Sequence, residues 1–408
     1  MNLSGYHDLK TLQKQWKGKV CLFGTGLIGC TWGYDLVKAA GFCVDFYCDN
    51  KKNAGEVIRD GIKTVLPEDL YSLKDDVLVF ITAGEKYQQE IKTQLDKNGI
   101  HHSLKMSFAF LQSFMEELTE LGSQKAKEQF QCIVDDAEYL RRQFQYRAGY
   151  PLDLENPRTF NEKIQWLKLY DRNPAYIRMV DKYEVKKYVS AKAGREYVIP
   201  TYGVYDNFDE IQFDKLPDQF VLKCTHDSGS VVICSCKSEF DMNEARHILE
   251  RGLKRNFYWH AREWPYKGVK PRIIAEKYMT DESGRELKDY KVFNFNGRAR
   301  LIQVDYDRFA VHKRNLYTTD WKYVEAVIKY PTDPERQIER PKNLEKMIEV
   351  SQRLAEGIPH VRVDMYLVGD KIYFGEMTFH HGAGYEKFDP EEFGLELGKW
   401  IEIRGGVK

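Results

Sequence analysis

Two apolar β-type runs near the carboxyl end of the chain each carry one acidic residue. Asp364 lies in the run VRVDMY and Glu376 in the run YFGEMTF, and residues 368–371, VGDK, separate them. A turn of this length predicts a hairpin, which can bring both carboxylates onto one face of a sheet. Because apolar strands rarely bury acids without a partner, the pair predicts a bound cation, and Mg²⁺ accepts carboxylate ligands. The alternative is an exposed pair of acids on a surface hairpin.

Two more polar residues fall on the same face by strand alternation. Thr378 lies two residues after Glu376 and could add a third oxygen ligand. Arg362 lies two residues before Asp364, which would place its guanidinium beside the metal. A cation in that position can stabilise an oxygen that gains negative charge during a reaction.

A lysine earlier in the chain is followed by a small polar loop. Lys223 lies in the run QFVLKCTH, and Asp227, Ser228, Gly229 and Ser230 lead into the strand-like run SVVICSC. A strand, a loop of this composition and a second strand could fold over phosphates as a lid, with the lysine against their charge. The alternative is a plain hairpin whose lysine stem points inward.

Glycines near the amino terminus follow a nucleotide-binding pattern. Gly24, Gly26 and Gly29 fit G-x-G-x-x-G between a strand-like and a helical run, and Asp49 ends the next strand-like run. Such glycines let the backbone approach a phosphate at a helix start. The ligand could be NAD(P), a nucleotide sugar or a polymer end, and the alternative is a structural turn that binds nothing. The segment resembles small Rossmann-like modules found beside enzymes that modify bacterial surface glycans, which suggests substrate handling.

Alternation of strand-like and helical runs divides the chain. Residues 1–105 predict a Rossmann-like parallel α/β domain, and residues 106–150 predict a helical connector with one buried face. Residues 151–408 begin with two amphipathic helices and continue with alternating β-type runs, which predicts a catalytic region of α+β type.

Charge and hydropathy exclude some classes of protein. Lysine plus arginine equals aspartate plus glutamate at 62 each, which gives no case for a nucleic-acid binder. The first residues lack the apolar core of a signal peptide, and no run approaches the roughly 20 apolar residues of a transmembrane helix. We therefore expect a cytoplasmic protein, which could form a homo-oligomer.

Eight segments over roughly residues 150–403 resemble, in order, the TupA-like branch of the ATP-grasp superfamily. Members are associated with bacterial cell-wall and capsular polysaccharide biosynthesis. The resemblance implies an ATP-grasp unit that uses ATP and Mg²⁺ to activate a carboxylate. The segments are TFNEKIQWLKLY, LPDQFVLKCTHDSGSVVI, YWHAREWPY, KPRIIAEKYM, DYKVFNFNG, VDYDRFAVHKRNLY, VRVDMY and FGEMTFHHGAGYEKFDP.

The resemblance also implies roles for single residues. Lys223 would contact the ATP phosphates, residues 228–230 would cover them, and Arg362 would steady the acyl-phosphate oxygen. The metal carboxylates would be Asp364 and Glu376. The remaining nucleotide contacts would be Glu276, Lys277, Tyr278 and Met279 at the adenine, mostly through backbone groups, and Asp289 and Lys291 at the ribose or phosphates.

The sequence departs from the family pattern at two places. Thr378 stands where many ATP-grasp enzymes have an asparagine metal ligand, which puts the metal geometry in doubt. His380 and His381 replace the Tyr-Pro expected before the glycine-rich residues 382–384. The two histidines either contact substrate or pack inside the protein.

A basic cluster is a candidate for the substrate site. His312, Lys313 and Arg314 could hold a carboxylate, and Arg314 is suited to a bidentate, catalytic contact. Asp305 and Arg308 on the preceding stretch could help. The alternative for three basic residues in a loop is a solvated surface.

Together these features predict an ATP-dependent carboxylate–amine ligase that acts on a bacterial surface saccharide or its nucleotide-linked precursor. Three alternatives remain open. The same apparatus fits a kinase of a glycan-precursor metabolite, and the amino-terminal glycines alone would fit a non-catalytic nucleotide-sugar-binding module. A glycosyltransferase is the third, and it would consume no ATP.

Overall fold

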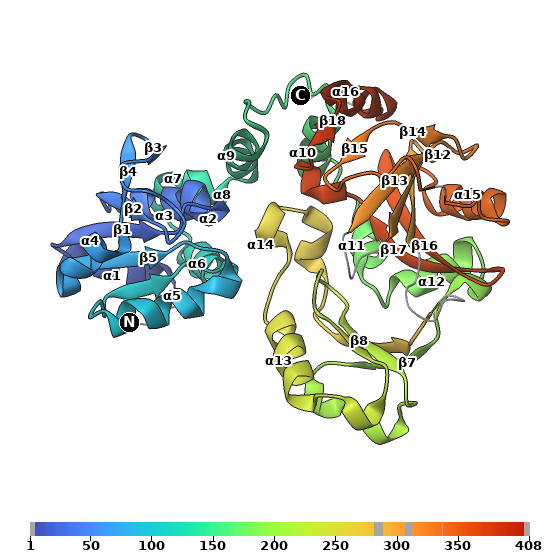
Figure 1. Cartoon of the computed structure of the whole chain (residues 1–408), viewed down its shortest axis with the longest axis horizontal. Helices are drawn as coiled ribbons and strands as arrows, with labels where there is room; N and C mark the ends of the chain where they lie inside the picture. Colours follow the sequence, from blue (N-terminus) through green and yellow to red (C-terminus); the bar gives the residue numbers. More distant parts are fainter. Residues whose placement is uncertain (1–4, 281–288, 307–311, 337, 404–408) are drawn as a thin grey trace. The chain divides into compact units, whose positions relative to one another are not determined.

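The computed structural model describes residues 5–280, 289–306, 312–336 and 338–403. The chain forms two compact units, residues 1–152 and residues 153–408 (Figure 1). Among the described residues, every helix is too short or too polar to cross a membrane.

Unit 1 is built on a mostly parallel sheet with the order β3-β4-β2-β1-β5-β6. Only β3 runs antiparallel to its neighbour, and the central strands are apolar runs buried on both faces. The strands are β1 (Lys19–Phe23), β2 (Phe46–Cys48), β3 (Val57–Arg59), β4 (Ile62–Val65), β5 (Val77–Ile81) and β6 (Ser103–Lys105).

Helices from two parts of the sequence complete unit 1. Tyr6 on the first helix contacts Phe114 and Phe130 edge-on, so the segment that follows the sheet packs in the same unit. The helices are α1 (Tyr6–Gln15), α2 (Leu27–Cys30), α3 (Trp32–Ala40), α4 (Pro67–Ser72), α5 (Glu85–Lys97), α6 (Phe108–Leu121), α7 (Gln124–Gln129), α8 (Gln131–Val134) and α9 (Asp136–Ala148).

Unit 2 contains two antiparallel sheets. The small sheet has the order β7-β10-β8-β9, and the large sheet has the order β14-β13-β12-β11-β16-β17. A further pair, β15 and β18, stands apart. The strands are β7 (Thr201–Tyr205), β8 (Phe220–Cys224), β9 (Val231–Cys234), β10 (Ile273–Lys277), β11 (Asp289–Phe295), β12 (Arg298–Tyr306), β13 (Lys313–Tyr317), β14 (Tyr323–Val324), β15 (Val327–Ile328), β16 (His360–Val368), β17 (Lys371–Thr378) and β18 (Phe388–Asp389).

Local sequence explains where the helices of unit 2 begin. Thr159 and Glu162 form a reciprocal capping box at the start of α10, as the T-x-x-E pattern predicts. Asp241 accepts two backbone N–H bonds at the start of α13. The helices are α10 (Phe160–Tyr170), α11 (Ala175–Val180), α12 (Val185–Lys192), α13 (Met242–Leu253), α14 (Tyr258–Ala261), α15 (Leu344–Leu354) and α16 (Glu391–Trp400). The predicted fold class, parallel α/β followed by α+β, is confirmed.

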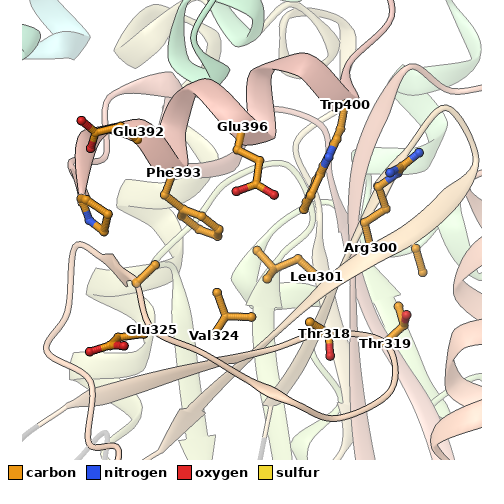
Figure 2. A pocket seen from close by; sticks show the side chains of 13 residues that line it. Arg300, Leu301, Thr318, Thr319, Val324, Glu325, Glu392, Phe393, Glu396 and Trp400 are labelled. Atoms are coloured by element: carbon orange, nitrogen blue, oxygen red, sulfur yellow. The ribbon is translucent and has the colours of Figure 1, made fainter.

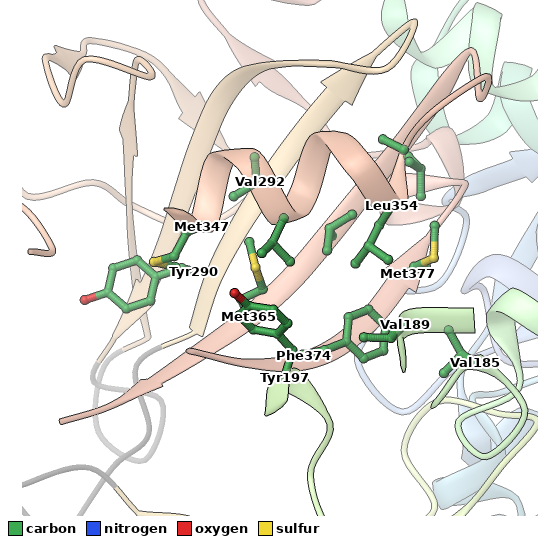
Figure 3. Packing of buried hydrophobic residues seen from close by; sticks show 14 of the residues in the cluster. Val185, Val189, Tyr197, Tyr290, Val292, Met347, Leu354, Met365, Phe374 and Met377 are labelled. Carbon is green, nitrogen blue, oxygen red and sulfur yellow. The ribbon is translucent and has the colours of Figure 1, made fainter. Parts of the chain in front are cut away.

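The main core of unit 2 lies between α15 and the large sheet. Leu344, Met347, Val350 and Leu354 recur at helical spacing and are all buried. Figure 3 shows α15 over the strands that carry Met365 and the other core residues of the large sheet. This packing fixes β16 and β17, which carry the predicted metal ligands.

The packing predicts the effect of a core truncation. Replacing Met347 by alanine should lower the free energy of unfolding of unit 2 by about 2–5 kcal/mol, because a fully buried side chain leaves a cavity. Urea unfolding followed by tryptophan fluorescence measures this change. The neighbouring exposed Lys346→Ala is the control, and an equal loss in both variants would contradict the assigned packing.

Candidate active site

The hairpin β16–β17 brings the predicted metal ligands together. Asp364 lies directly opposite Glu376, and Arg362 lies opposite Thr378 in the strand register. Cross-strand partners share one face of a sheet, so all four side chains gather at one place. The hairpin and the common face are those expected from strand alternation.

Arg362 lies between the two acids. Its Nε and Nη2 donate to Asp364 Oδ1 and Oδ2 at 2.6 and 2.7 Å. The same Nη2 is 3.2 Å from Glu376 Oε1 and 3.1 Å from Thr378 Oγ1. The guanidinium therefore compensates both carboxylates, which buried acids require.

Two residues of β11, the strand beside β16 in the large sheet, extend this cluster. Lys291 Nζ donates to Asp364 Oδ2 at 2.7 Å and also to Asp289, and all three residues are buried. Burial raises the pKa of Asp364, although Arg362 and Lys291 oppose that rise. The predicted nucleotide contacts Asp289 and Lys291 thus face the acid cluster. Their contact with ribose or phosphate stays a prediction.

Glu376 is the more accessible acid of the pair. Its side chain is 46% exposed, against 3% for Asp364. Burial acts to raise the pKa of Glu376, but the positive charges of Arg362 and Lys291 outweigh it and lower that pKa to about 2. Glu376 is therefore ionised at neutral pH, as a metal ligand must be.

One narrow cavity joins Lys223 to Glu376. Its volume is about 50 Å³, and its walls come from α12, β8, β10 and the hairpin β16–β17. The predicted lysine and a predicted metal ligand thus face one space. The lining residues are Lys182, Lys186, Val198, Ile199, Lys223, Glu276, Tyr366, Phe374, Gly375 and Glu376.

Two lysines in this cavity were not singled out from the sequence. Lys182 Nζ donates to the backbone carbonyl of Asp227, and Lys186 Nζ donates at 2.7 Å to both Ile199 O and Thr201 Oγ1. The available signal was the run DKYEVKKYV, which carries the two lysines four residues apart. The structure places Lys186 on α12 and Lys182 in the turn before that helix.

Glu276 connects two of these lysines through its side chain. Its carboxylate pairs with Lys186 and lies 3.0 Å from Lys223 Nζ. Burial acts to raise the pKa of Glu276, but the two lysines lower it overall. The expected backbone role of residues 276–279 is untested, and the Lys277 N–H is already bonded to Pro200 O at 3.0 Å. Lys277, Tyr278 and Met279 do not line the cavity.

The predicted lid loop joins β8 to β9. Ser230 is buried and donates to the Asp227 carboxylate, whereas Ser228 and Gly229 are exposed. Gly229 has φ = 102°, a left-handed conformation that favours glycine. None of Ser228, Gly229 and Ser230 lines the cavity, and their contact with phosphates stays a prediction.

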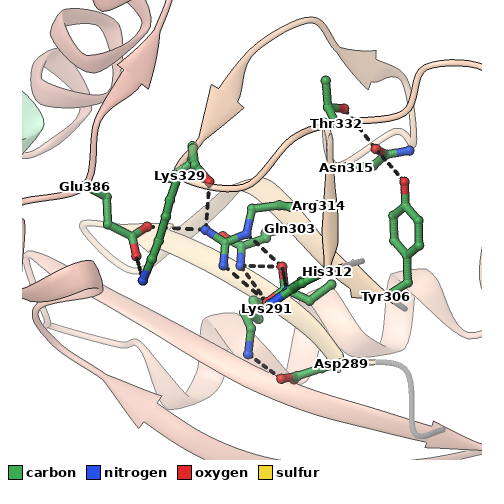
Figure 4. Close-up of polar contacts among 12 residues, drawn as sticks. Asp289, Lys291, Gln303, Tyr306, His312, Arg314, Asn315, Lys329, Thr332 and Glu386 are labelled. Atoms are coloured by element: carbon green, nitrogen blue, oxygen red, sulfur yellow. Dashed lines mark hydrogen bonds and ion pairs between the residues drawn. The ribbon is translucent and has the colours of Figure 1, made fainter. Parts of the chain in front are cut away.

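Arg314 is buried among acids of its own chain. Its Nε and Nη2 contact the two oxygens of Asp305 at 2.7 and 3.3 Å, and its Nη1 reaches Ile328 O at 3.0 Å and Glu386 Oε2 at 3.3 Å. Figure 4 shows Arg314 and Lys329 converging on Glu386. A solvated surface is therefore wrong for Arg314, and its contact with a substrate carboxylate stays a prediction.

The other members of the basic cluster also have partners. Lys313 Nζ lies within ion-pair distance of Asp333, and the His312 ring stacks on Tyr330 with a centroid distance of 3.9 Å. Arg308 lies outside the described residues. The cluster therefore carries acids beside its bases, which reduces its positive field.

Both predicted histidines pack inside unit 2. His380 Nδ1 is 3.4 Å from Glu263 Oε2. His381 Nδ1 accepts from Arg362 Nη1 at 2.6 Å, and its Nε2 is 3.0 Å from Glu386 Oε2. Burial lowers the pKa of His381 to about 4. Both histidines are buried, and His381 contacts Arg362. Their contact with substrate stays a prediction.

The predicted amino-terminal ligand site lies in unit 1. Gly24 has φ = 119°, and a Cβ on Gly29 would lie 2.0 Å from Gly24 O, so the turn itself requires both glycines. The Asp49 carboxylate accepts from Thr25 N and Oγ1 at 2.9 and 2.8 Å. A Cβ on Gly26 would meet open space. A ligand at this turn stays a prediction.

A larger cavity of about 520 Å³ lies elsewhere in unit 2. Figure 2 shows Phe393, Glu396 and Trp400 extending from α16 toward Leu301 and Val324. It shares no lining residue with the cavity around Lys223, and none of the predicted site residues lines it. Size alone therefore does not identify the site of chemistry.

The low pKa of His381 predicts a pH dependence of stability. An unfolded histidine titrates near pH 6.5, whereas folded His381 takes up its proton only near pH 4. The unfolded state therefore binds more protons between these values, and the free energy of unfolding falls as pH drops from about 6.5 to about 4. His381→Asn should make this slope shallower, by at most about 1.4 kcal/mol per pH unit. Urea midpoints at several pH values test this, with the exposed His247→Asn as control.

A comparison with known protein families gives a match within unit 2. A family model described as TupA-like ATPgrasp matches residues 162–402. No curated protein matches the chain significantly.

Three of the solved structures that match the chain are distant likenesses. D-alanine–D-alanine ligase from Bacillus anthracis is 15% identical, with 89% of this chain and 87% of that chain covered and a TM-score of 0.29. D-cycloserine synthetase DcsG is 13% identical, with 94% and 100% covered and a TM-score of 0.33. An ATP-grasp RimK domain protein from Sphaerobacter thermophilus is 11% identical, with 56% and 69% covered and a TM-score of 0.32. Likenesses with TM-scores this low add nothing on function.

The match to the family model spans more than half of the chain and includes Lys223, Arg362, Asp364 and Glu376. The resemblance seen in the eight sequence segments is thereby confirmed. This chain belongs to the TupA-like ATP-grasp family.

Proposed function

We propose that this enzyme is an ATP-dependent carboxylate–amine ligase that works with Mg²⁺. The observation that carries the proposal is the single cavity shared by Lys223 and Glu376, beside the Arg362 guanidinium. A phosphate-binding cation, an accessible metal carboxylate and an oxyanion-stabilising cation are the parts that phosphorylation of a carboxylate requires.

The two carboxylates have lone pairs left that could bind a metal ion. A carboxylate offers about four lone pairs, and Asp364 uses three of them, for two N–H groups of Arg362 and one of Lys291. Among the described residues, Glu376 Oε2 accepts no hydrogen bond, while Oε1 accepts from Thr378. Asp364, Glu376 and Thr378 would hold Mg²⁺, which when bound neutralises the charge of the phosphates.

Such a metal would need ligands beyond the protein. Within the part of the chain that the structure describes, no group of three or more His, Cys, Asp or Glu side chains could hold a metal ion alone. Mg²⁺ is commonly bound by one or two carboxylates together with substrate phosphates. The donor set here fits that arrangement.

The residues then divide the chemistry as follows. Lys182, Lys186 and Lys223 bind the phosphates of ATP through their ammonium groups. Arg362 stabilises the oxygen that gains charge when the substrate carboxylate attacks the terminal phosphate and ADP leaves. An amine then attacks the acyl phosphate, loses a proton, forms the amide and releases inorganic phosphate.

The saccharide context rests on the family resemblance. We propose a uronic acid or an amino sugar of a cell-wall or capsular polysaccharide, or its nucleotide-linked precursor, as one substrate. A nucleotide sugar at the Gly24–Gly26–Gly29 turn would be consistent with this. An enzyme that uses ATP and such precursors would act in the cytoplasm.

Product analysis separates the ligase from its alternatives. The enzyme is incubated with ATP, Mg²⁺, a uronic acid and an amine, and free phosphate and amide are measured. We expect phosphate release that needs both substrates, with one amide formed per phosphate. A phosphorylated product would identify a kinase. Sugar released from a nucleotide donor without ATP consumption would identify a glycosyltransferase.

The role of Lys223 gives a second prediction. Lys223→Met should weaken Mg²⁺·ATP binding by about 10–100-fold, because a charge-assisted contact contributes about 1.5–3 kcal/mol. Isothermal titration calorimetry measures the dissociation constant. Lys187→Met is the matched control, because Lys187 lies beside Lys186 on α12 but is 70% exposed and pairs with Glu184. Equal weakening in both variants would contradict the proposed nucleotide site.

A further inference from the structure

We infer that His381 is a positioning residue that fixes the Arg362 guanidinium as a neutral hydrogen-bond acceptor, and that Glu386 fixes His381 in turn. The inference rests on the proposed ligase function for its kinetic consequence. The geometry on which it is built does not depend on that function.

The contact with Arg362 determines the tautomer of His381. A guanidinium has five N–H donors and no acceptor, so Arg362 Nη1 must donate to His381 Nδ1 across their 2.6 Å contact. Nδ1 therefore carries no proton, and a neutral ring must carry it on Nε2. That nitrogen lies 3.0 Å from Glu386 Oε2, an ion-pair distance at which the contact does not have the angle of a hydrogen bond.

A neutral partner at Nη1 adds no negative charge beside the Arg362 guanidinium. Asp364 already neutralises one charge through its two contacts with Arg362. A further carboxylate at Nη1 would reduce the field that the guanidinium offers to a charged oxygen, whereas an imidazole fixes orientation without adding charge. The second N–H of Nη1 meets no acceptor among the described residues, and it remains for a ligand oxygen.

Glu386 is itself held in place. Arg314 Nη1 and Lys329 Nζ each lie 3.3 Å from its oxygens. Arg314 is fixed in turn by both oxygens of Asp305. A continuous chain of contacts therefore runs from Arg314 on β13 through Glu386 and His381 to Arg362 on β16. In the structure, Arg314 of the basic cluster is the first member of this chain.

The loop that carries His381 is fixed by α10. Gly382, Ala383 and Gly384 have φ values of 55°, 52° and 68°, which is a strained conformation for the alanine. Gln165 donates to the carbonyls of Ala383 and Gly384 at 3.1 and 2.8 Å, and Lys168 donates to Ala383 O at 2.7 Å. Strain of this kind persists only where surrounding contacts impose it.

The competing interpretation is that His381 only fills space. Its ring also contacts Phe293 and Phe160 edge-on, at 4.8 and 6.3 Å between centroids. Two substitutions separate the interpretations, because they keep different halves of the histidine. His381→Asn keeps an acceptor near the Nδ1 position, and His381→Gln keeps a donor near the Nε2 position.

The tautomer is tested on the whole chain without any assay of activity. Nitrogen-15 NMR of labelled histidines at neutral pH, with the His381→Asn spectrum for assignment, should show an unprotonated Nδ1 and a protonated Nε2. A proton on Nδ1, alone or together with one on Nε2, would overturn the inference. Failure of the ligase proposal would leave this result unaffected.

Kinetics with the uronic acid and amine pair tests the consequence. His381→Gln should lower kcat by about 100-fold, because Arg362 loses its orienting acceptor, whereas His381→Asn should stay within about tenfold of the wild type. The KM for ATP should change less than about twofold in both. Equal losses of kcat in the two variants, or a loss that appears in the KM for ATP, would show a merely structural role and overturn the inference. If the wild type forms no amide, the ligase proposal fails, and the NMR result alone decides on His381.

Discussion

The site depends on one interaction, the pairing of Arg362 with Asp364 on neighbouring positions of β16. Two buried opposite charges are tolerated only when they satisfy each other, and both contacts are 2.6–2.7 Å long. Lys291 from β11 adds a second cation at the same acid. These charged residues lie on strands of the large sheet, and the hydrophobic core between that sheet and α15 holds those strands in place. The packing of this core therefore sets the distances between the charged groups of the site.

The charged residues of the candidate site come from both sheets of unit 2. Lys223 and Glu276 come from the small sheet, whereas Arg362, Asp364 and Glu376 come from the large sheet. Lys186 lies on α12 and Lys182 in the turn before it, and both precede the two sheets in the sequence. A nucleotide bound by both sets would therefore connect the two sheets, and its phosphates would meet the acids only where the sheets face each other.

Strand periodicity was enough to predict the hairpin face that carries Arg362, Asp364, Glu376 and Thr378, because alternation is a property of every strand. It was not enough for Arg314. Three basic residues in a row suggest an anion site, but charge compensation by Asp305 and Glu386 depends on contacts between segments 9 and 72 residues apart. The same holds for His381, whose partner Arg362 lies 19 residues earlier, on β16. Strand alternation can be seen in a short stretch of sequence, whereas the pairing of charged residues that are far apart in the chain cannot.

The closed form of the cavity has a consequence for how a nucleotide enters. The cavity volume of about 50 Å³ is far below the roughly 300–1,000 Å³ of small-molecule sites. In addition, the Glu276 carboxylate already forms ion pairs with the ammonium groups of Lys186 and Lys223. Under the proposed function, phosphates would reach these lysines when Glu276 gives up part of its contacts with them. The Glu276 carboxylate compensates the charges of two partly buried lysines. Under the proposed function, ATP would compete with this carboxylate for the same ammonium groups.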